Sequence, residues 1–291
     1  MVPTPFCSIA GLGAYLPAIV LTNEHFAARL DTSDAWIVER TGIHERRRAD
    51  VGEATSDLAH KAATAALADA GVRPDQIDLI LLATSTADSP VPASACHLQA
   101  KLGCGEAPSM DVSAGCSGFG YALHMAAGLI RAQMHQRVLV IGADCLTRIT
   151  NYADRQSCIL FGDGAGAAMV AREGSLDVVY SSLGADGTAA EMICIRAGGS
   201  RLPASRDTIE HAQHTLELRG REVFKAAVRR MSDCLHRAAR ELGMHARDFD
   251  LIIPHQANAR IIEAVGSHLE ADPAKLLVDV AGTGNTAAAS I

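Results

Sequence analysis

The sequence has few aromatic residues and no excess of positive charge. Only 4% of its 291 residues are aromatic, and 26 Lys and Arg are outnumbered by 33 Asp and Glu, which gives a formal net charge of −7. Because nucleic acids are bound by clustered Lys and Arg, they are not expected partners. No stretch approaches the roughly 20 apolar residues that cross a bilayer, and the first residues lack the basic segment of a secretory signal. We therefore expect a cytoplasmic protein with no membrane partner.

Metal-binding motifs are also missing. Neither CxxC nor HExxH occurs in the sequence, so no metal is expected. His211 and His214 lie beside Glu210, a pattern that is more typical of a solvated surface. The eight cysteines are spread through a large acidic chain, whereas disulfide frameworks are typical of small secreted proteins. Most of these cysteines are predicted to be small buried apolar residues.

Aliphatic residues, by contrast, are abundant. Hydrophobic residues make up 48% of the chain, enough for a large core, and the length suits one or two domains. Apolar runs alternate with helical periodicity, which predicts a mostly parallel sheet covered on both faces. Strands are expected at 6–12, 78–84, 108–112, 137–142, 165–171, 176–183, 250–254 and 276–280, and helices at 55–70, 92–101, 218–242, 257–268 and after Cys116.

The sequence repeats itself. AALADAGVRPDQIDLILLA (65–83) aligns with RAARELGMHARDFDLIIPH (237–255), and MDVSAGCSG (110–118) aligns with VDVAGTGNT (278–286). Two matches in the same order at nearly the same offset indicate two related halves, 1–172 and 173–291. The first half continues with a helix and two strands after its second match. We therefore expect the native polypeptide to continue beyond Ile291 with a helix and a strand pair.

Cys116 is the candidate nucleophile. It follows an expected strand and a turn of small residues, and it precedes a long helical pattern. A cysteine at the start of a helix is exposed to the positive end of the helix dipole, which predicts a lowered thiol pKa and fast alkylation. A buried structural cysteine at a strand–helix junction is the alternative interpretation.

His255 and Asn285 are predicted to lie near Cys116. His255 ends the repeated strand of the second half, and Asn285 lies on the turn that corresponds to the Cys116 turn. Ligands of open α/β sheets bind at the carboxyl ends of the strands. The internal symmetry therefore predicts that the three side chains meet at one site.

Five segments resemble the β-ketoacyl-acyl-carrier-protein synthase III family: TSDAWIVERTGIHERR (32–47), DVSAGCSGFGYAL (111–123), DRQSCILFGDGAGA (154–167), PHQANARII (254–262) and GTGNTAAASI (282–291). The resemblance implies a duplicated thiolase-like αβαβα sandwich, with two mixed sheets and helices between and outside them. It also implies decarboxylative condensation of an acyl-CoA starter with malonyl-acyl-carrier protein, which begins fatty acid or related polyketide synthesis.

The resemblance also implies roles for individual residues. Cys116 corresponds to the acylated nucleophile, and His255 and Asn285 to the donors that stabilise the enolate. Acyl-CoA is a substrate, and no cofactor is implied. A homodimer is expected, in which Val91 reaches the acyl pocket of the partner subunit. Positions that bind CoA correspond to Thr32, Trp36, Arg40, Arg155, Gly220, Phe224 and Asn258, and positions that dock the carrier protein to Lys225 and Arg260.

Two other functions stay open at this point. One is an acyltransferase of the same fold that moves the acyl group to a hydroxyl or an amine without decarboxylation. The other is a non-catalytic partner subunit. Release of CO₂ from malonyl-carrier protein distinguishes condensation from both alternatives. The presence of all three candidate catalytic residues favours the condensing enzyme.

Overall fold

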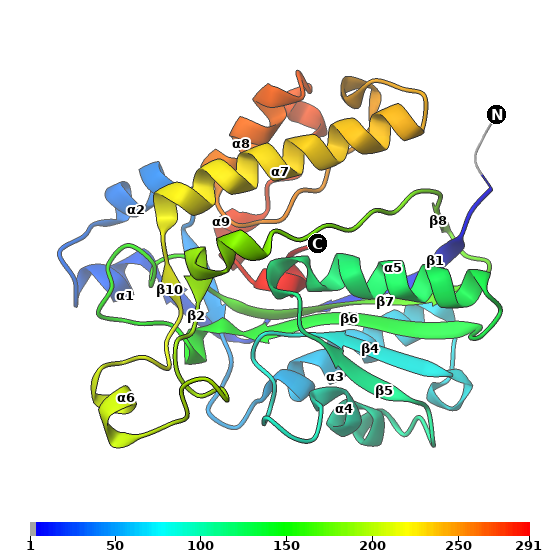
Figure 1. Ribbon diagram of the computed structural model, residues 1–291, viewed down its shortest axis with the longest axis horizontal. Helices are drawn as coiled ribbons and strands as arrows, with labels where there is room; N and C mark the ends of the chain where they lie inside the picture. The colour runs from blue at the N-terminus through cyan, green and yellow to red at the C-terminus, as the bar shows by residue number, and fades with distance from the viewer. Residues whose placement is uncertain (1–3) are drawn as a thin grey trace.

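A six-stranded mixed sheet forms the centre of the molecule (Figure 1). The computed structural model describes residues 4–291. The strand order is β5-β4-β6-β7-β1-β8. The strands are β1 (Cys7–Tyr15), β4 (Leu79–Ala83), β5 (Ser109–Val112), β6 (Arg137–Cys145), β7 (Asp163–Ala171) and β8 (Leu176–Val178).

Helices cover both faces of this sheet. Helices α3 (Thr55–Ala70) and α4 (Ser94–Leu102) pack on one face, and α5 (Gly118–Arg131) packs on the other. Ile80 and Leu82 of β4 join the core on the α3 side, whereas Leu79 and Leu81 join the core on the α5 side. This alternation is why β4 reads as a continuous apolar run: both of its faces are buried.

The second half is built mainly from helices (Figure 1). Helices α7 (Gly220–Glu241) and α8 (Ala259–His268) pack together around a separate apolar cluster that includes Val228, Ile252 and Val265. The remaining elements are α1 (Asn23–Ala27), α2 (Asp34–Thr41), α6 (Arg206–Glu210), α9 (Val280–Thr283), and the strand pairs β2 (Ile19–Thr22) with β3 (Glu45–Arg48) and β9 (Ile193–Cys194) with β10 (Glu217–Leu218). Within residues 4–291, no helix is both long enough and apolar enough to span a membrane.

The expected strands of the first half are confirmed, but the prediction of a mostly parallel sheet is wrong. Strand β4 runs parallel to β5 and β6, whereas β7 is antiparallel to β6 and β1, and β8 is antiparallel to β1. The chain passes from β4 to β5 through α4 and from β5 to β6 through α5, and such helical crossovers allow the strands to run parallel. Strands β6 and β7 follow each other without a long helix between them, and such a connection permits antiparallel pairing.

Three strands are expected in the second half. The first, 176–183, is shorter in the structure, where β8 (Leu176–Val178) joins the sheet of the first half beside β1. Within residues 4–291, the other two meet at a single bridge. Ile252 pairs with Leu276, and no longer ladder continues from them. Pro254 has no N–H to extend the ladder. The side chain of Gln256 instead accepts from Asp279 N at 2.7 Å and donates to Leu277 O at 3.2 Å. Residues 280–283 form α9, where the sequence predicted the end of a strand.

The two copies of the repeat share their turns. Helix α3 is followed by Gly71 at φ 63° and α7 by Gly243 at φ 68°, and a 3₁₀ turn comes next in both copies. Only glycine adopts this left-handed conformation without steric cost. The repeat is therefore visible in local backbone geometry, while the division at residue 172 stays a prediction.

Candidate active site

Cys116 lies on the 3₁₀ turn Gly115–Ser117, between β5 and α5. Gly115 adopts φ 56°, so this turn needs a residue without a Cβ atom. The partly buried Cys116 packs against an apolar cluster that contains Leu146, Phe161 and Ala287. The strand–turn–helix position expected from the sequence is thus confirmed.

The expected lowering of the Cys116 pKa is wrong for this state of the site. Burial, together with the nearby carboxylate of Asp144, raises the pKa of the thiol to about 12. Desolvation disfavours the charged thiolate, and the backbone hydrogen bond at Cys116 offsets only part of this effect. The thiol is therefore neutral at neutral pH, and attack on a carbonyl requires that a base removes its proton.

Asp144 is a buried carboxylate at the end of β6 that the sequence reasoning missed. Its Oδ1 accepts from Ser85 N at 2.7 Å, and its Oδ2 accepts from Ala288 N at 3.2 Å. Burial raises its pKa to about 7, although these hydrogen bonds act in the opposite direction. Asp144 thus ties the first-half sheet to the 3₁₀ turn Ala287–Ser290.

His255 is held by Ser290. The imidazole Nδ1 lies 2.6 Å from Ser290 Oγ, and the same oxygen accepts a long hydrogen bond from Gln256 N at 3.4 Å. Burial lowers the pKa of His255 to about 4, so the ring is neutral at neutral pH. Ser290 Oγ accepts from the Gln256 backbone and can donate its own proton to Nδ1, and in that arrangement the imidazole proton lies on Nε2.

Asn285 is fixed by its backbone and by its side-chain oxygen. Its N–H donates to Leu160 O at 2.8 Å, and its carbonyl accepts from Gly162 N at 3.0 Å. Oδ1 accepts from Ala287 N at 2.9 Å. The side-chain oxygen is therefore occupied, and Nδ2 is the atom through which Asn285 can donate to a ligand.

The turn Ala287–Ser290 brings the three candidate residues together. Ala287 belongs to the apolar cluster of Cys116 and bonds to Asn285, while Ser290 bonds to His255. The three side chains come from segments about 30 to 170 residues apart in the sequence. The site thus offers a partly buried thiol, a neutral imidazole and a carboxamide around one short turn.

Two arginines lie over the ring of Trp36. The guanidinium carbons of Arg40 and Arg155 lie 4.7 and 5.0 Å from the centre of its ring. Arg155 Nη1 also donates to the backbone oxygen of Asp31 at 2.6 Å. Trp36 packs against the apolar cluster of Leu160, which also contacts the Cys116 cluster. This planar, cationic surface suits an aromatic base with phosphates.

Two further predicted residues, Asn258 and Thr32, come from segments next to this surface. Asn258 begins α8, accepts from Arg260 N at 2.9 Å and donates to Arg40 O at 3.2 Å. It therefore joins α8 to the end of α2. The hydroxyl oxygen of Thr32 is buried and has no hydrogen-bond partner within residues 4–291, so it can bond to a ligand.

The α7 residues belong to a different part of the site. Gly220 is the first residue of α7, and Phe224 packs against the apolar cluster that α7 and α8 share. Lys225 and Arg260 are both exposed, as a docking surface requires. Val91 is 83% exposed on the loop before α4.

In the described part of the chain, no three His, Cys, Asp or Glu side chains lie close enough together to hold a metal ion. All eight cysteines are free, and four of them are buried: Cys7, Cys104, Cys145 and Cys158. The prediction that most are buried thus holds for half of them.

Comparisons with known proteins agree on one family. Residues 110–187 match the family model described as 3-Oxoacyl-[acyl-carrier-protein (ACP)] synthase III, and residues 239–291 match the model of its C-terminal part. A beta-ketoacyl-[acyl-carrier-protein] synthase III of Caldanaerobacter subterraneus subsp. tengcongensis is 47% identical over 97% of this chain and 86% of the relative.

Solved structures give the same result. The 3-oxoacyl-[acyl-carrier-protein] synthase III of Aquifex aeolicus VF5 matches with a TM-score of 0.89 and 40% identity, over 98% of this chain and 88% of that one. The synthase III of Pseudomonas aeruginosa PAO1 matches with a TM-score of 0.89 and 39% identity, over 98% and 86%. The fold is that of the thiolase-like condensing enzymes, as expected. The chain therefore belongs to the β-ketoacyl-acyl-carrier-protein synthase III family of transferase-type condensing enzymes.

Proposed function

We propose that this protein condenses an acyl-CoA with malonyl-acyl-carrier protein through an acyl-enzyme on Cys116, and so initiates fatty acid or related polyketide synthesis. The observation that carries the proposal is the convergence of Cys116, His255 and Asn285 on the turn Ala287–Ser290. Its relatives are named as synthases of this kind.

The first half-reaction is acyl transfer to Cys116. The thiol loses its proton, Sγ attacks the thioester carbonyl, and the tetrahedral intermediate expels the CoA thiolate, which is protonated to free CoA. A base is required because burial raises the pKa of Cys116 to about 12. The proton that leaves Cys116 ends on the departing CoA sulfur, and the unprotonated ring nitrogen of the neutral His255 would relay it.

The second half-reaction is decarboxylative condensation. The malonyl thioester loses CO₂, and the electron pair of the broken bond forms an enolate. Nε2–H of His255 and Nδ2–H of Asn285 would donate to the enolate oxygen, which stabilises the developing charge without a metal ion. The enolate carbon then attacks the acyl carbonyl, the bond between that carbonyl and Cys116 Sγ breaks, and 3-oxoacyl-carrier protein is released. The Cys116 thiolate then takes a proton from solvent.

The remaining residues would bind the two substrates. We propose that the adenine of CoA binds against Trp36 and Arg155, whose guanidinium carbon lies 5.0 Å from the centre of the indole ring. Thr32, Arg40, Gly220, Phe224 and Asn258 would line the path of CoA. The exposed cations of Lys225 and Arg260 would contact an acidic carrier protein, and Val91 would reach the acyl pocket of the partner subunit in a homodimer.

Labelled CO₂ tests this function directly. The protein is incubated with acetyl-CoA or a longer acyl-CoA and with malonyl-carrier protein labelled at its free carboxyl carbon. We expect labelled CO₂ and a 3-oxoacyl-carrier protein detected by mass spectrometry. Cys96→Ala, at an exposed cysteine away from the Cys116 turn, is the matched control and should keep full activity. Acyl transfer to a hydroxyl or an amine without CO₂ would support the alternative acyltransferase.

A further inference from the structure

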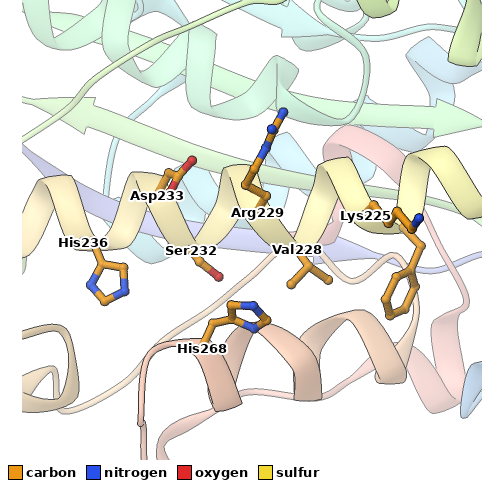
Figure 2. A pocket seen from close by; sticks show the side chains of 8 residues that line it. Lys225, Val228, Arg229, Ser232, Asp233, His236 and His268 are labelled. Carbon is orange, nitrogen blue, oxygen red and sulfur yellow. The ribbon is translucent and has the colours of Figure 1, made fainter.

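Several buried polar side-chain atoms have no hydrogen-bond partner within residues 4–291: Thr32 Oγ1, Arg46 Nε, Arg47 Nε and Ser232 Oγ. Ser232 lines a groove of about 430 Å³ between α7 and α8, together with Phe224 and Lys225 (Figure 2). Arg46, on β3, differs from these residues because its side chain is a cation at 0% exposure. None of the proposed substrate-binding or catalytic roles involves Arg46, so its burial needs another explanation.

The Arg46 guanidinium is buried without a carboxylate partner. The groups that accept its hydrogen bonds in the described part of the chain are neutral oxygens. Burial lowers its pKa to about 10, so the group is still charged at neutral pH. A buried charge is costly unless hydrogen bonds compensate for it, and arginine offers five N–H donors in a fixed plane. The oxygens that it reaches are therefore held in place by a strong and rigid set of donors.

These oxygens come from three segments of the chain. Nη1 donates to Asn23 Oδ1 at 2.7 Å and to Leu21 O at 3.4 Å, and Nη2 donates to Ile159 O. The guanidinium carbon also lies 4.6 Å from the centre of the Phe26 ring. Arg46 thus joins β2 and the start of α1 to the segment that precedes β7.

The segment that contains Ile159 is the one that pairs with Asn285. The N–H of Asn285 donates to Leu160 O at 2.8 Å, and Gly162 N donates to Asn285 O at 3.0 Å. These two bonds form a single parallel bridge that holds the Asn285 backbone. Ile159 O, which Arg46 binds, is one residue before the oxygen that accepts from Asn285.

The aliphatic stem of Arg46 packs beside the same bridge. A Cβ atom at Gly162 would lie 3.1 Å from Arg46 Cβ, and a Cβ atom at Gly284 would lie 3.0 Å from it. Both distances are shorter than ordinary van der Waals contact, so the two segments reach Arg46 because these residues lack side chains. The backbone on both sides of the bridge therefore follows the position of Arg46.

We propose that Arg46 is a positioning residue for Asn285: it fixes residues 159–162 and, through the backbone bridge, directs the Asn285 carboxamide toward the enolate. The proposal rests on the proposed function, in which Asn285 is an enolate donor. Oδ1 of Asn285 is bound to Ala287 N, so a shift of the Asn285 backbone moves Nδ2 relative to the substrate. Removal of Arg46 should therefore slow decarboxylation more than acylation of Cys116.

Two substitutions separate this role from a general contribution to folding. Arg46→Met keeps most of the side-chain length but removes the charge and every donor, whereas Arg46→Lys keeps the charge without the planar fork. Apolar residues of similar volume often replace buried ionic groups without loss of stability. Arg48→Lys, at an exposed position of the same strand, is the matched control and should behave as the unchanged chain. Thermal unfolding identifies a temperature at which the variants are folded.

The kinetic test compares the two half-reactions. Malonyl decarboxylation should fall about tenfold in Arg46→Met and less in Arg46→Lys, because a displaced donor costs less than the roughly 10²–10³-fold of a missing one. Single-turnover acylation of Cys116 should change less than about threefold. In an Asn285→Ala background, Arg46→Met should lower decarboxylation by less than about a further twofold, since both changes remove the same contribution. A further tenfold loss in that background would overturn the proposal, because Arg46 would then act through other residues.

Amide hydrogen exchange gives a measurement that does not depend on activity. In Arg46→Met, the amides of Gly162 and Asn285 should exchange at least about tenfold faster than in the unchanged chain, while those of α5 keep their rates. Unchanged rates at Gly162 and Asn285, a uniform acceleration along the chain, or unchanged decarboxylation would each overturn the proposal. If Arg46→Met does not fold, the same measurements on Arg46→Lys decide. If the unchanged protein releases no CO₂, the proposed function fails, and the exchange rates alone decide whether Arg46 holds Asn285.

Discussion

Cys116 and the His255–Asn285 pair are positioned by different kinds of interaction. Cys116 stands on a turn between β5 and α5, and both elements are anchored in the apolar core of the first half. His255 and Asn285 stand on irregular segments that are held by hydrogen bonds to Ser290, Leu160 and Gly162. Apolar packing therefore positions the nucleophile, whereas hydrogen bonds position the two enolate donors. We expect the two half-reactions to respond to different mutations for this reason.

The largest effect is expected for Cys116→Ala. Without Sγ no acyl-enzyme forms, so condensation should fall by at least about 10³-fold. Because His255 and Asn285 remain in place, malonyl decarboxylation should persist. Mass spectrometry detects the acyl-enzyme, and labelled CO₂ measures decarboxylation. Loss of both reactions to the same extent would contradict the separation of the two regions.

His255→Ala and Asn285→Ala should show the opposite pattern. Removal of one donor to a developing oxyanion costs roughly 10²–10³-fold, so malonyl decarboxylation should fall by that factor in each variant. Acylation of Cys116 should persist, although more slowly in His255→Ala. A single turnover with acyl-CoA alone isolates the acylation step. Normal release of CO₂ in both variants would show that these side chains do not stabilise the enolate.

Ser290→Ala should have a smaller effect on the same step. Loss of the 2.6 Å contact to Nδ1 lets His255 adopt the other tautomer, in which Nε2 has no proton for the enolate. We expect decarboxylation to fall about tenfold, with substantial recovery in Ser290→Thr, which keeps the hydroxyl. Histidine ¹⁵N spectra report the tautomer directly. An unchanged tautomer in Ser290→Ala would contradict this role.

The first region could be predicted from the sequence in much more detail than the second. Apolar periodicity located β4, β6, α3 and α5 because each of them is buried on a regular face. The turn at Cys116 followed from its strand and helix. In contrast, Ser290 and Asp144 gave no recognisable signal, because a serine and an aspartate are ordinary at any surface position. Their roles depend on contacts between segments that lie 35 and 144 residues apart.

The pKa values of the site could not be predicted from the sequence either. A cysteine at a helix start predicts a lowered pKa, yet burial and Asp144 raise the pKa of Cys116. Desolvation depends on everything that surrounds the sulfur, including Phe161 and Ala287 from other parts of the chain. The pairing of Ile252 with Leu276 is a similar case. It stops after one bridge because the side chain of Gln256 bonds to the backbone of the neighbouring segment. Apolar periodicity does not reveal such a side-chain bond.

The buried groups His255 and Asp144 make the free energy of unfolding depend on pH in opposite directions. His255 has a pKa of about 4, below its ordinary value of 6.5, so the unfolded chain binds more protons between these values. Stability should therefore fall as the pH decreases through this window, by up to about 3 kcal/mol from this residue. Asp144, whose pKa is raised to about 7 from 3.8, has the opposite sign and opposes this loss. Urea unfolding of His255→Gln across the window should show less destabilisation toward acid than the unchanged chain.

The smallest effect is expected at Val91, which belongs to neither region in this chain. The residue is 83% exposed, so Val91→Phe should leave folding and both half-reactions with acetyl-CoA nearly unchanged. If Val91 reaches the acyl pocket of a partner subunit, the larger ring reduces the room for the starter. One missing or added group in an apolar pocket changes discrimination by about 1–3 kcal/mol, or roughly 10- to 200-fold at most. We expect acyl groups longer than acetyl to be accepted by the unchanged protein and to lose about 3- to 5-fold in kcat/KM in Val91→Phe. Cross-linking verifies the dimer. A strict preference for acetyl-CoA that the substitution leaves unaltered would show that Val91 does not face the starter. Starter selection would then depend only on the Cys116 turn and the His255–Asn285 segments of one chain.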